Sequence, residues 1–201
     1  MAQLLRTGLH QTPNMSGRKL QTASQAYLPP EQNHLFTDEL VASRTIFNSA
    51  RTHRYTLYRH WGLGSDYCAF IGMNPSGADV LHDDRTVAKC CRLAKRWGYD
   101  SLYMLNAFAL RSTKPEELYE AADPIGPDND LYIREIASKA ALVVVAWGKP
   151  ARHLNRDQQV AALLQQACAP NRVKCFALNN DGTAKHPLYV KEDSELIAFP
   201  L

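Results

Sequence analysis

The stretch FIGMNPSGADVLHDDRT, residues 70–86, holds side chains that are suited to chemistry. An apolar run breaks into a polar turn at Asn74, and two carboxylates, Asp83 and Asp84, follow it. An amide can donate and accept hydrogen bonds but cannot act as a general base near neutral pH, whereas a carboxylate can. The place of Asp83 and Asp84 directly before RTVAKCC favours a helix N-cap, and activation of a water by Asp84 is the second reading.

Polar loops also follow the other apolar runs. Asn106 lies in MLNAF, WGKPA follows ALVVVAW, and His186 lies in NNDGTAKHPLY after RVKCFAL. Because ligands bind at the carboxyl ends of the strands in a parallel sheet, we expect these loops to meet at one rim. Gly72 and Gly77 allow a ligand to approach the backbone closely. Neither a GxGxxG motif nor a P-loop motif occurs, so a dinucleotide site or a P-loop is unsupported.

Apolar runs and amphipathic segments alternate along most of the chain. The strand-like runs are YCAFIGM, SLYMLNAFAL, ALVVVAW and RVKCFAL, and the helix-like segments are RTVAKCCRLAKRWG, PEELYEAA, GPDNDLYIREIASKA and DQQVAALLQQAC. Near-continuous apolar runs are typical of strands that are covered on both faces. The order predicts an α/β fold, a three-layer α/β/α sandwich around a mainly parallel central sheet.

The segment RYTLYRHWG, before these elements, alternates between apolar and polar residues like a strand. Strict alternation places Tyr55, Leu57 and Arg59 on one face. We expect this strand to pair with a strand near residues 43–47.

Composition predicts a small cytoplasmic protein. The chain has 201 residues and a net charge of +3, which permits contact with nucleic acid without requiring it. Residues 1–36 are polar and predict a flexible or loosely packed extension, and residues 37–201 predict one domain. No apolar run reaches the roughly 20 residues that cross a bilayer, so we expect no membrane contact. The five cysteines lack metal-ligand spacing, and we expect reduced core thiols, no metal and no cofactor.

Four motifs, GMNPSG, LYMLNAF, VVVAWGKPA and KHPLY, occur in this order between Tyr67 and Tyr189. This order resembles the uracil-DNA glycosylase superfamily and, more closely, an uncharacterised bacterial and phage domain family related to it. In the glycosylases the corresponding motifs are GxDPY or GxNPG, LLN, LWGxxA and HPSP. The resemblance implies a uracil-DNA glycosylase-like fold and a monofunctional DNA glycosylase, a hydrolase that leaves an abasic site.

The resemblance also implies roles for individual residues. Asn74 would orient the attacking water, and His186, as a neutral donor, would stabilise the departing base. Asn106 would read the edge of a flipped base. The implied substrate-binding residues are Gly72, Met73, Pro75, Ser76, Asn106 and Phe108. Because an amide orients water without deprotonating it, we expect a slow enzyme.

Basic residues suggest how DNA is held. Helical spacing puts Arg85, Lys89, Arg92 and Arg96 on one face, which we call the basic stripe. Such a face can neutralise phosphates, although a solvated helix face is the ordinary reading. The remaining basic contacts that we expect are Lys149, Arg152 and Lys185. The resemblance also implies DNA contacts for Leu188 and Tyr189, which lie where the family has its intercalating loop. The expected partner is double-stranded DNA with a flipped base, bound by a monomer.

Departures from the family pattern point to an unusual substrate. Asn74 stands where the efficient uracil enzymes have aspartate, which argues against ordinary uracil repair. The aromatic residue that stacks on the base shortly after the first motif has no clear counterpart, since ADVLHDD stands there. A roomier pocket suits a modified or mismatched pyrimidine, and a bulky hypermodified cytosine of phage DNA would imply a role in antiviral defence.

Two other functions remain open at this stage. The first is an N-glycosidase or other hydrolase of free nucleotides, and the second is a module that binds a modified base without catalysis. The basic stripe favours DNA over free nucleotides, because a nucleotide hydrolase needs no extended phosphate-binding face.

Overall fold

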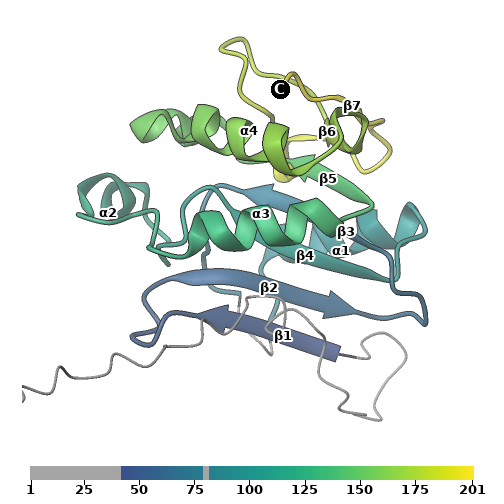
Figure 1. Cartoon of the computed structure of the whole chain (residues 1–201), viewed down its shortest axis with the longest axis horizontal. Coiled ribbons are helices and arrows are strands. Elements are labelled where there is room, and N and C mark those ends of the chain that lie inside the picture. The colour runs from purple at the N-terminus through teal and green to yellow at the C-terminus, as the bar shows by residue number, and fades with distance from the viewer. Residues whose placement is uncertain (1–41, 79–81) are drawn as a thin grey trace, which may run out of the picture.

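A computed structural model describes residues 42–78 and 82–201 of the chain. The extension predicted over residues 1–36 lies outside these residues. A seven-stranded sheet runs through the molecule in the order β1-β2-β4-β3-β5-β6-β7 (Figure 1). The strands are β1 Ala42–Phe47, β2 Arg54–His60, β3 Tyr67–Gly72, β4 Ser101–Asn106, β5 Leu142–Val145, β6 Val173–Cys175 and β7 Ile197–Ala198.

The sheet is mixed. Its middle strands β4, β3, β5 and β6 are parallel, which confirms the predicted parallel centre. The pairs β1/β2, β2/β4 and β6/β7 are antiparallel, so the parallel arrangement does not extend to the edges. The expected pairing of residues 43–47 with the strand that contains Leu57 is confirmed by the β1/β2 ladder.

Helices cover both faces of the sheet. The helices are α1 Arg85–Arg96, α2 Pro115–Glu120, α3 Asn129–Lys139 and α4 Arg156–Ala167, with short 3-10 turns at η2 Lys149–Asn155, η3 Pro170–Arg172 and η4 Pro187–Tyr189. Helix α3 lies in front of the sheet and α1 lies behind it (Figure 1). One hydrophobic cluster joins α2, α3 and α4 to the sheet, and a second cluster joins α1 to the opposite face. None of these helices is long and apolar enough to cross a membrane.

Helix α1 begins and ends where the sequence predicts. Asp84 is its N-cap, and the chain leaves the helix through Gly98, which has a φ of 82°. A left-handed backbone of this kind costs glycine little, which is why glycine ends the helix. The helix buries Val87, Cys90 and Leu93 against the sheet. Four of the five cysteines are buried and all are free, as the sequence suggested.

Strand β2 contains a β-bulge near its start. Ile46 lies opposite Thr56, but the next residue, Phe47, lies opposite Arg54. Tyr55 is therefore an extra residue in β2. Such a residue breaks the alternation of side chains between the two faces of a sheet.

The bulge corrects the side-chain assignment that strict alternation gave for β2. Tyr55 stacks on Tyr132 of α3 at 5.0 Å, whereas Leu57 packs in the cluster beneath α1. Tyr55 and Leu57 therefore face opposite sides of the sheet. Arg54 donates to the carbonyl oxygen of Ala78, so its side chain points toward the segment that leads into α1, as Arg59 does. Strict alternation would have placed Arg54 and Arg59 on different faces.

Antiparallel pairing also brings the start of β2 to the rim where ligands are expected. The carboxyl ends of β3 and β4 lie side by side, with Gly72 paired with Asn106. Because β2 runs antiparallel to β4, its first residue, Arg54, lies at this same edge of the sheet. The amide of Arg54 donates to the carbonyl oxygen of Ala109, just beyond the end of β4.

Candidate functional site

A cavity of about 250 Å³ opens at the carboxyl ends of β3 and β4. It brings together most of the predicted catalytic and base-binding residues, namely Gly72, Met73, Asn74, Ser76, Asp84, Asn106 and His186. Its other lining residues are Arg54, Thr86, Val87, Met104, Ser112 and Thr113, and the sequence did not single out these. The motifs at the ends of two strands therefore meet at one site with the loop that carries His186.

Hydrogen bonds fix the orientation of the Asn74 amide. Its Nδ2 donates to the carbonyl oxygens of Ser112 at 2.8 Å and Pro75 at 3.2 Å. Both amide hydrogens are thus used, and Oδ1 is the atom of this side chain that can accept a hydrogen from a water. Pro75 itself is buried and does not line the cavity. Its part in the site is this backbone carbonyl.

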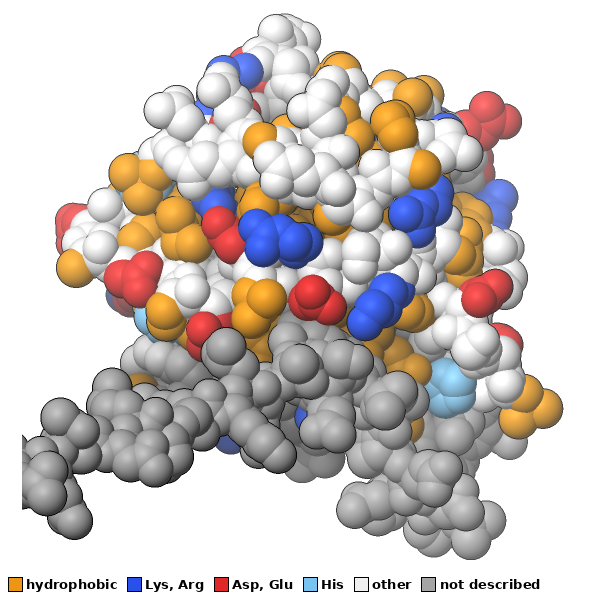
Figure 2. Space-filling model, viewed as in Figure 1, with side chains coloured by type: hydrophobic (Ala, Val, Ile, Leu, Met, Phe, Trp, Pro, Cys, Tyr) orange, Lys and Arg blue, Asp and Glu red, His pale blue; other side chains and the backbone are white. Residues whose placement is uncertain are grey.

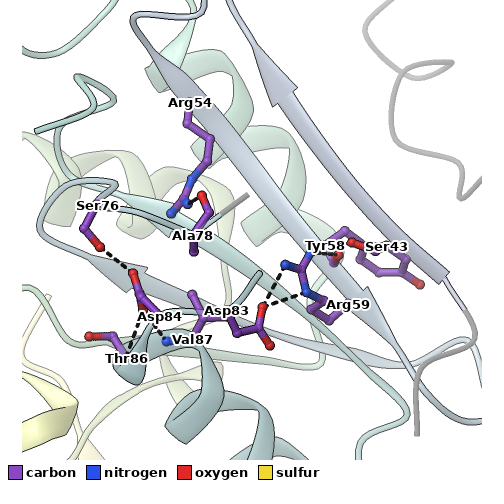
Figure 3. Close-up of polar contacts among 10 residues, drawn as sticks. All are labelled: Ser43, Arg54, Tyr58, Arg59, Ser76, Ala78, Asp83, Asp84, Thr86 and Val87. Atoms are coloured by element: carbon purple, nitrogen blue, oxygen red, sulfur yellow. Dashed lines mark hydrogen bonds and ion pairs between the residues drawn. The ribbon is translucent and has the colours of Figure 1, made fainter. Parts of the chain in front are cut away.

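Asp84 has both a capping role and a place in the cavity wall. Its Oδ1 accepts the amides of Thr86 at 2.9 Å and Val87 at 2.8 Å, which confirms the N-cap (Figure 3). Its Oδ2 accepts the hydroxyl of Ser76, another cavity residue. These three donors hold the carboxylate in one orientation, so its negative charge is a fixed feature of the cavity.

Asn106 brings a buried donor to the cavity. The residue is 2% exposed, and its Nδ2 has no hydrogen-bond partner among the described residues. Such an atom costs about 1–3 kcal/mol of desolvation that a ligand acceptor would recover. A Cβ at Gly72 would lie 3.1 Å from Asn106 Oδ1, so glycine makes the room that this side chain needs. The amide of Asn129 donates to the carbonyl oxygens of Asn106 and Ala107 and anchors the backbone here.

Arg54 is the charged cavity residue that the sequence did not reveal. It is 2% exposed, its Nη1 donates to the carbonyl oxygen of Ala78 at 2.5 Å, and its Nε has no partner among the described residues. Burial lowers the pKa of the guanidinium to about 10, against the opposing effect of Asp84, so Arg54 stays protonated at neutral pH. The sequence signal that could have found Arg54 is its position as the first residue of the predicted strand RYTLYRHWG.

His186 is held as a neutral donor. It is the N-cap of η4, and its Nδ1 accepts the amide of Leu188 at 3.3 Å. Burial lowers its pKa below the ordinary value, although the charge of Asp84 acts in the opposite direction. The neutral ring then carries its proton on Nε2, which is free to donate to a ligand.

A second cavity of about 430 Å³ lies next to the first, and both are lined by Met73 and His186. Its other lining residues are Trp147, Gly148, Lys149, Pro150, Asn179 and Tyr189. The wall is largely apolar and aromatic, and the Nε1 of buried Trp147 has no partner in the described part of the chain. Met73 and His186 therefore lie between a polar cavity and a larger apolar one.

A family model described as "Protein of unknown function (DUF1643)" matches residues 54–188. The chain belongs to the DUF1643 family. The match begins at Arg54 and includes every residue that lines the first cavity. No curated protein and no solved structure gives a significant match to this chain.

Phe108 does not line the first cavity, although the resemblance implied that it binds the substrate. It is fully buried in the cluster beneath α2, α3 and α4, where its ring lies 5.8 Å from that of His153. Burial of an aromatic ring in a core is worth a few kcal/mol, so Phe108 serves packing. Among the described residues, no group of three or more His, Cys, Asp or Glu side chains could hold a metal ion.

The basic stripe is not an open face. Lys89 is 9% exposed and its Nζ donates to the carbonyl oxygen of Val190 at 2.5 Å, which contradicts its assignment as a phosphate contact. Arg92 forms an ion pair with Glu192, and Arg96 donates to the carbonyl oxygen of the same residue. The chain after η4 therefore runs along the stripe and binds some of its donors, while Arg92 and Arg96 stay exposed. Arg85 remains exposed at the start of α1.

The other predicted DNA contacts lie nearer the second cavity. Lys149 is exposed and lines that cavity, and Tyr189, 82% exposed, lines it as well. Leu188 is also exposed, whereas Lys185 is half-buried. Arg152 is held by the carbonyl oxygen of Asp181 and the carboxylate of Asp157, so it is less available to a phosphate.

Proposed function

We propose that the protein is a DNA glycosylase that hydrolyses the N-glycosidic bond of a modified or mismatched pyrimidine. The observation that carries the proposal is the single cavity in which Asn74, Asn106 and neutral His186 meet. Cleavage of an N-glycosidic bond leaves positive charge on the sugar and negative charge on the base, and these residues can stabilise and orient the reacting groups.

The chemistry follows from the orientation of the side chains. The oxygen of a water forms a bond to the sugar C1′, and the electron pair of the broken C–N bond leaves with the base. Asn74 Oδ1 accepts a hydrogen from that water, since Nδ2 is held by Ser112 and Pro75. His186 Nε2–H donates to an oxygen of the departing base. The water loses its proton to the surroundings or to Asp84, and the released base takes up a proton.

The second cavity supports a bulky substrate. It shares Met73 and His186 with the first cavity, so a substituent on the base has about 430 Å³ of neighbouring space. A hypermodified cytosine, such as a glycosylated hydroxymethylcytosine of phage DNA, fits this description better than uracil does. Excision of such bases would destroy the phage template, which makes antiviral defence the proposed role.

DNA would approach the molecule at the rim of the second cavity. Exposed Leu188 and Tyr189 can enter the duplex as the base flips out, and Lys149 can bind a phosphate. On the face that carries α3 and α4, basic and acidic side chains are mixed with apolar ones (Figure 2). A mixed face of this kind attracts a polyanion weakly.

A second candidate is hydrolysis of free nucleotides, and the contacts between the stripe and the chain after η4 favour it. An open basic stripe would favour DNA over nucleotides, but its Lys89, Arg92 and Arg96 bind residues 190–192. A hydrolase of free nucleotides would use the same two cavities and would need no surface contacts with DNA.

One assay separates these functions. Duplexes and phage DNAs that carry uracil, mismatched thymine, hydroxymethylcytosine or glucosylated hydroxymethylcytosine are incubated with the protein, and half of each sample is then treated with alkali. We expect alkali-dependent breaks at one base, and we expect Asn74→Ala to abolish them with DNA binding retained. The corresponding free nucleotides are tested in parallel. Release of base from nucleotides alone would establish the second candidate, and binding without breaks would establish a base-reading module.

A further inference from the structure

Arg54 differs from the other fully buried arginines of this protein. Arg59 forms an ion pair with Asp83 at 2.7 Å, and Arg156 forms one with Asp130. The hydrogen-bond partner of Arg54, in contrast, is the neutral carbonyl oxygen of Ala78, and no ion pair involves Arg54 in the described part of the chain. A buried charge without an ion-pair partner is unfavourable, and the nearby carboxylate of Asp84 offsets the burial of Arg54 only in part. The fold must therefore gain something from the charge of Arg54 at this position.

The surroundings of Arg54 indicate what it binds. Arg54 and Asn106 line the same cavity, and each has a buried donor without a partner among the described residues, Nε in one and Nδ2 in the other. Two unpartnered donors at one cavity suit a ligand that presents acceptor atoms and negative charge. Neither donor can be satisfied by a purely apolar ligand.

The position of Asp84 completes the charge arrangement of the cavity. Arg54 extends from β2 and Asp84 from the start of α1, and both point toward the segment that carries Ser76 and Ala78 (Figure 3). The lining of the cavity thus contains a guanidinium that comes from β2 and a carboxylate that comes from the start of α1. This pair matches a reaction that separates charge, with an anion forming near Arg54 and a cation near Asp84.

We infer that Arg54 is a catalytic residue that binds the departing base and stabilises its negative charge. This inference rests on the proposed glycosidic cleavage, in which the electron pair of the C–N bond leaves with the base. Arg54 and Asn106 donate hydrogen bonds to the acceptor atoms of the base anion, and Asp84 faces the sugar that becomes positive. A guanidinium that is 2% exposed stabilises an anion more strongly than the neutral imidazole of His186 does.

Binding of free bases tests the role of Arg54 without need of a substrate. The probes are 5-nitrouracil, whose nitro group makes the ring an anion near neutral pH, and thymine, which has a similar shape and stays neutral. Calorimetry on the full chain gives the ratio of the two dissociation constants. We expect the wild type to bind the anion about tenfold more tightly or better, and Arg54→Gln to bring the ratio close to one.

Two more variants serve as controls. Arg59→Gln removes the other buried arginine of β2, which points to the same side of the sheet but does not line the cavity, and it should keep the preference for the anion. Arg54→Lys keeps the charge and should keep part of the preference, and it provides the comparison if Arg54→Gln does not fold. A wild type that binds the anion no better than thymine, or binds neither, overturns the inference. Unchanged preference in folded Arg54→Gln overturns it as well.

The same samples distinguish a failure of this inference from a failure of the proposed function. Alkali-dependent breaks in DNA without a preference for the anion overturn the role of Arg54 and leave glycosylase activity standing. A preference for the anion that Arg54→Gln removes, without breaks on any DNA or release from any nucleotide, overturns glycosidic cleavage and supports Arg54 as the anion-binding group of the cavity.

Discussion

Arg92 of α1 and Glu192 form an ion pair in which Nη2 lies 2.6 Å from Oε1, although the residues are 100 positions apart in the sequence. Together with the bond from Lys89 to Val190, this pair ties the chain after η4 to α1. Both partners of the ion pair are about half exposed, so solvent screens the pair and its own contribution to stability is small. The basic stripe thus holds the segment that follows His186.

For the proposed binding of DNA, this arrangement predicts which basic side chains contact phosphates. We expect Lys149→Ala to weaken binding to all sequences and to reduce the salt slope of the affinity by about one phosphate contact. Arg92→Ala should leave the salt slope unchanged, because Glu192 already neutralises that guanidinium. Fluorescence anisotropy with a labelled duplex at several salt concentrations measures both. A salt slope that falls in Arg92→Ala and not in Lys149→Ala would show that the basic stripe binds phosphates, as the sequence suggested.

Asp84 allows its structural and chemical roles to be measured separately. Asp84→Ala removes the N-cap of α1, and we expect it to lower the free energy of unfolding by about 0.5–2 kcal/mol. Asp84→Asn keeps an equally good cap and should restore most of that loss in urea unfolding. If the charge of the carboxylate assists the reaction, Asp84→Asn should still lose activity. Full activity in Asp84→Asn would reduce this residue to its capping role.

Much of this site could be predicted because strand ends and motif order are local features. Asn74 and Asn106 each end an apolar run, and the parallel pairing of Gly72 with Asn106 brings the two ends together, as the rule for parallel sheets predicts. The N-cap at Asp84 follows from its place before a helix. These inferences need a segment and its neighbours, and little knowledge of tertiary contacts.

The errors come from contacts that a local pattern cannot contain. Helical periodicity identified the face that carries Lys89 and Arg92, but it gives no information on the chain that covers that face. The bulge at Tyr55 depends on pairing with β1, and it reverses the side of the sheet that alternation assigns to Arg54. Alternation alone therefore does not bring Arg54 to the side of the sheet on which α1 and the cavity lie.

The pKa of His186 predicts a pH dependence of stability. Burial lowers this pKa in the folded protein below the ordinary value of 6.5. As the pH falls below about 6.5, the unfolded chain binds the proton first, so the folded state loses stability until the pH passes the folded pKa. His186→Asn keeps an acceptor for the Leu188 amide but cannot titrate.

Urea unfolding at about pH 7.5 and about pH 5 measures this effect of His186. We expect the wild type to lose more free energy of unfolding between the two pH values than His186→Asn does. Equal losses would show that the ring is not held in the neutral form by its surroundings.

Asn74→Asp separates what the family resemblance suggests from what this structure implies. The efficient uracil enzymes have aspartate at the matching position, so the resemblance alone suggests that the carboxylate would speed up the reaction. Here, Nδ2 of Asn74 faces the carbonyl oxygens of Ser112 and Pro75. A carboxylate oxygen would meet two acceptors without a proton to share, at a cost of about 1–3 kcal/mol. We therefore expect Asn74→Asp to be less stable than the wild type in urea unfolding and to lose activity, as we also expect of Asn74→Ala. A faster and equally stable Asn74→Asp enzyme would show that the loop reorganises around an acid, and the amide would then be a substitute for a general base and not a requirement of this site.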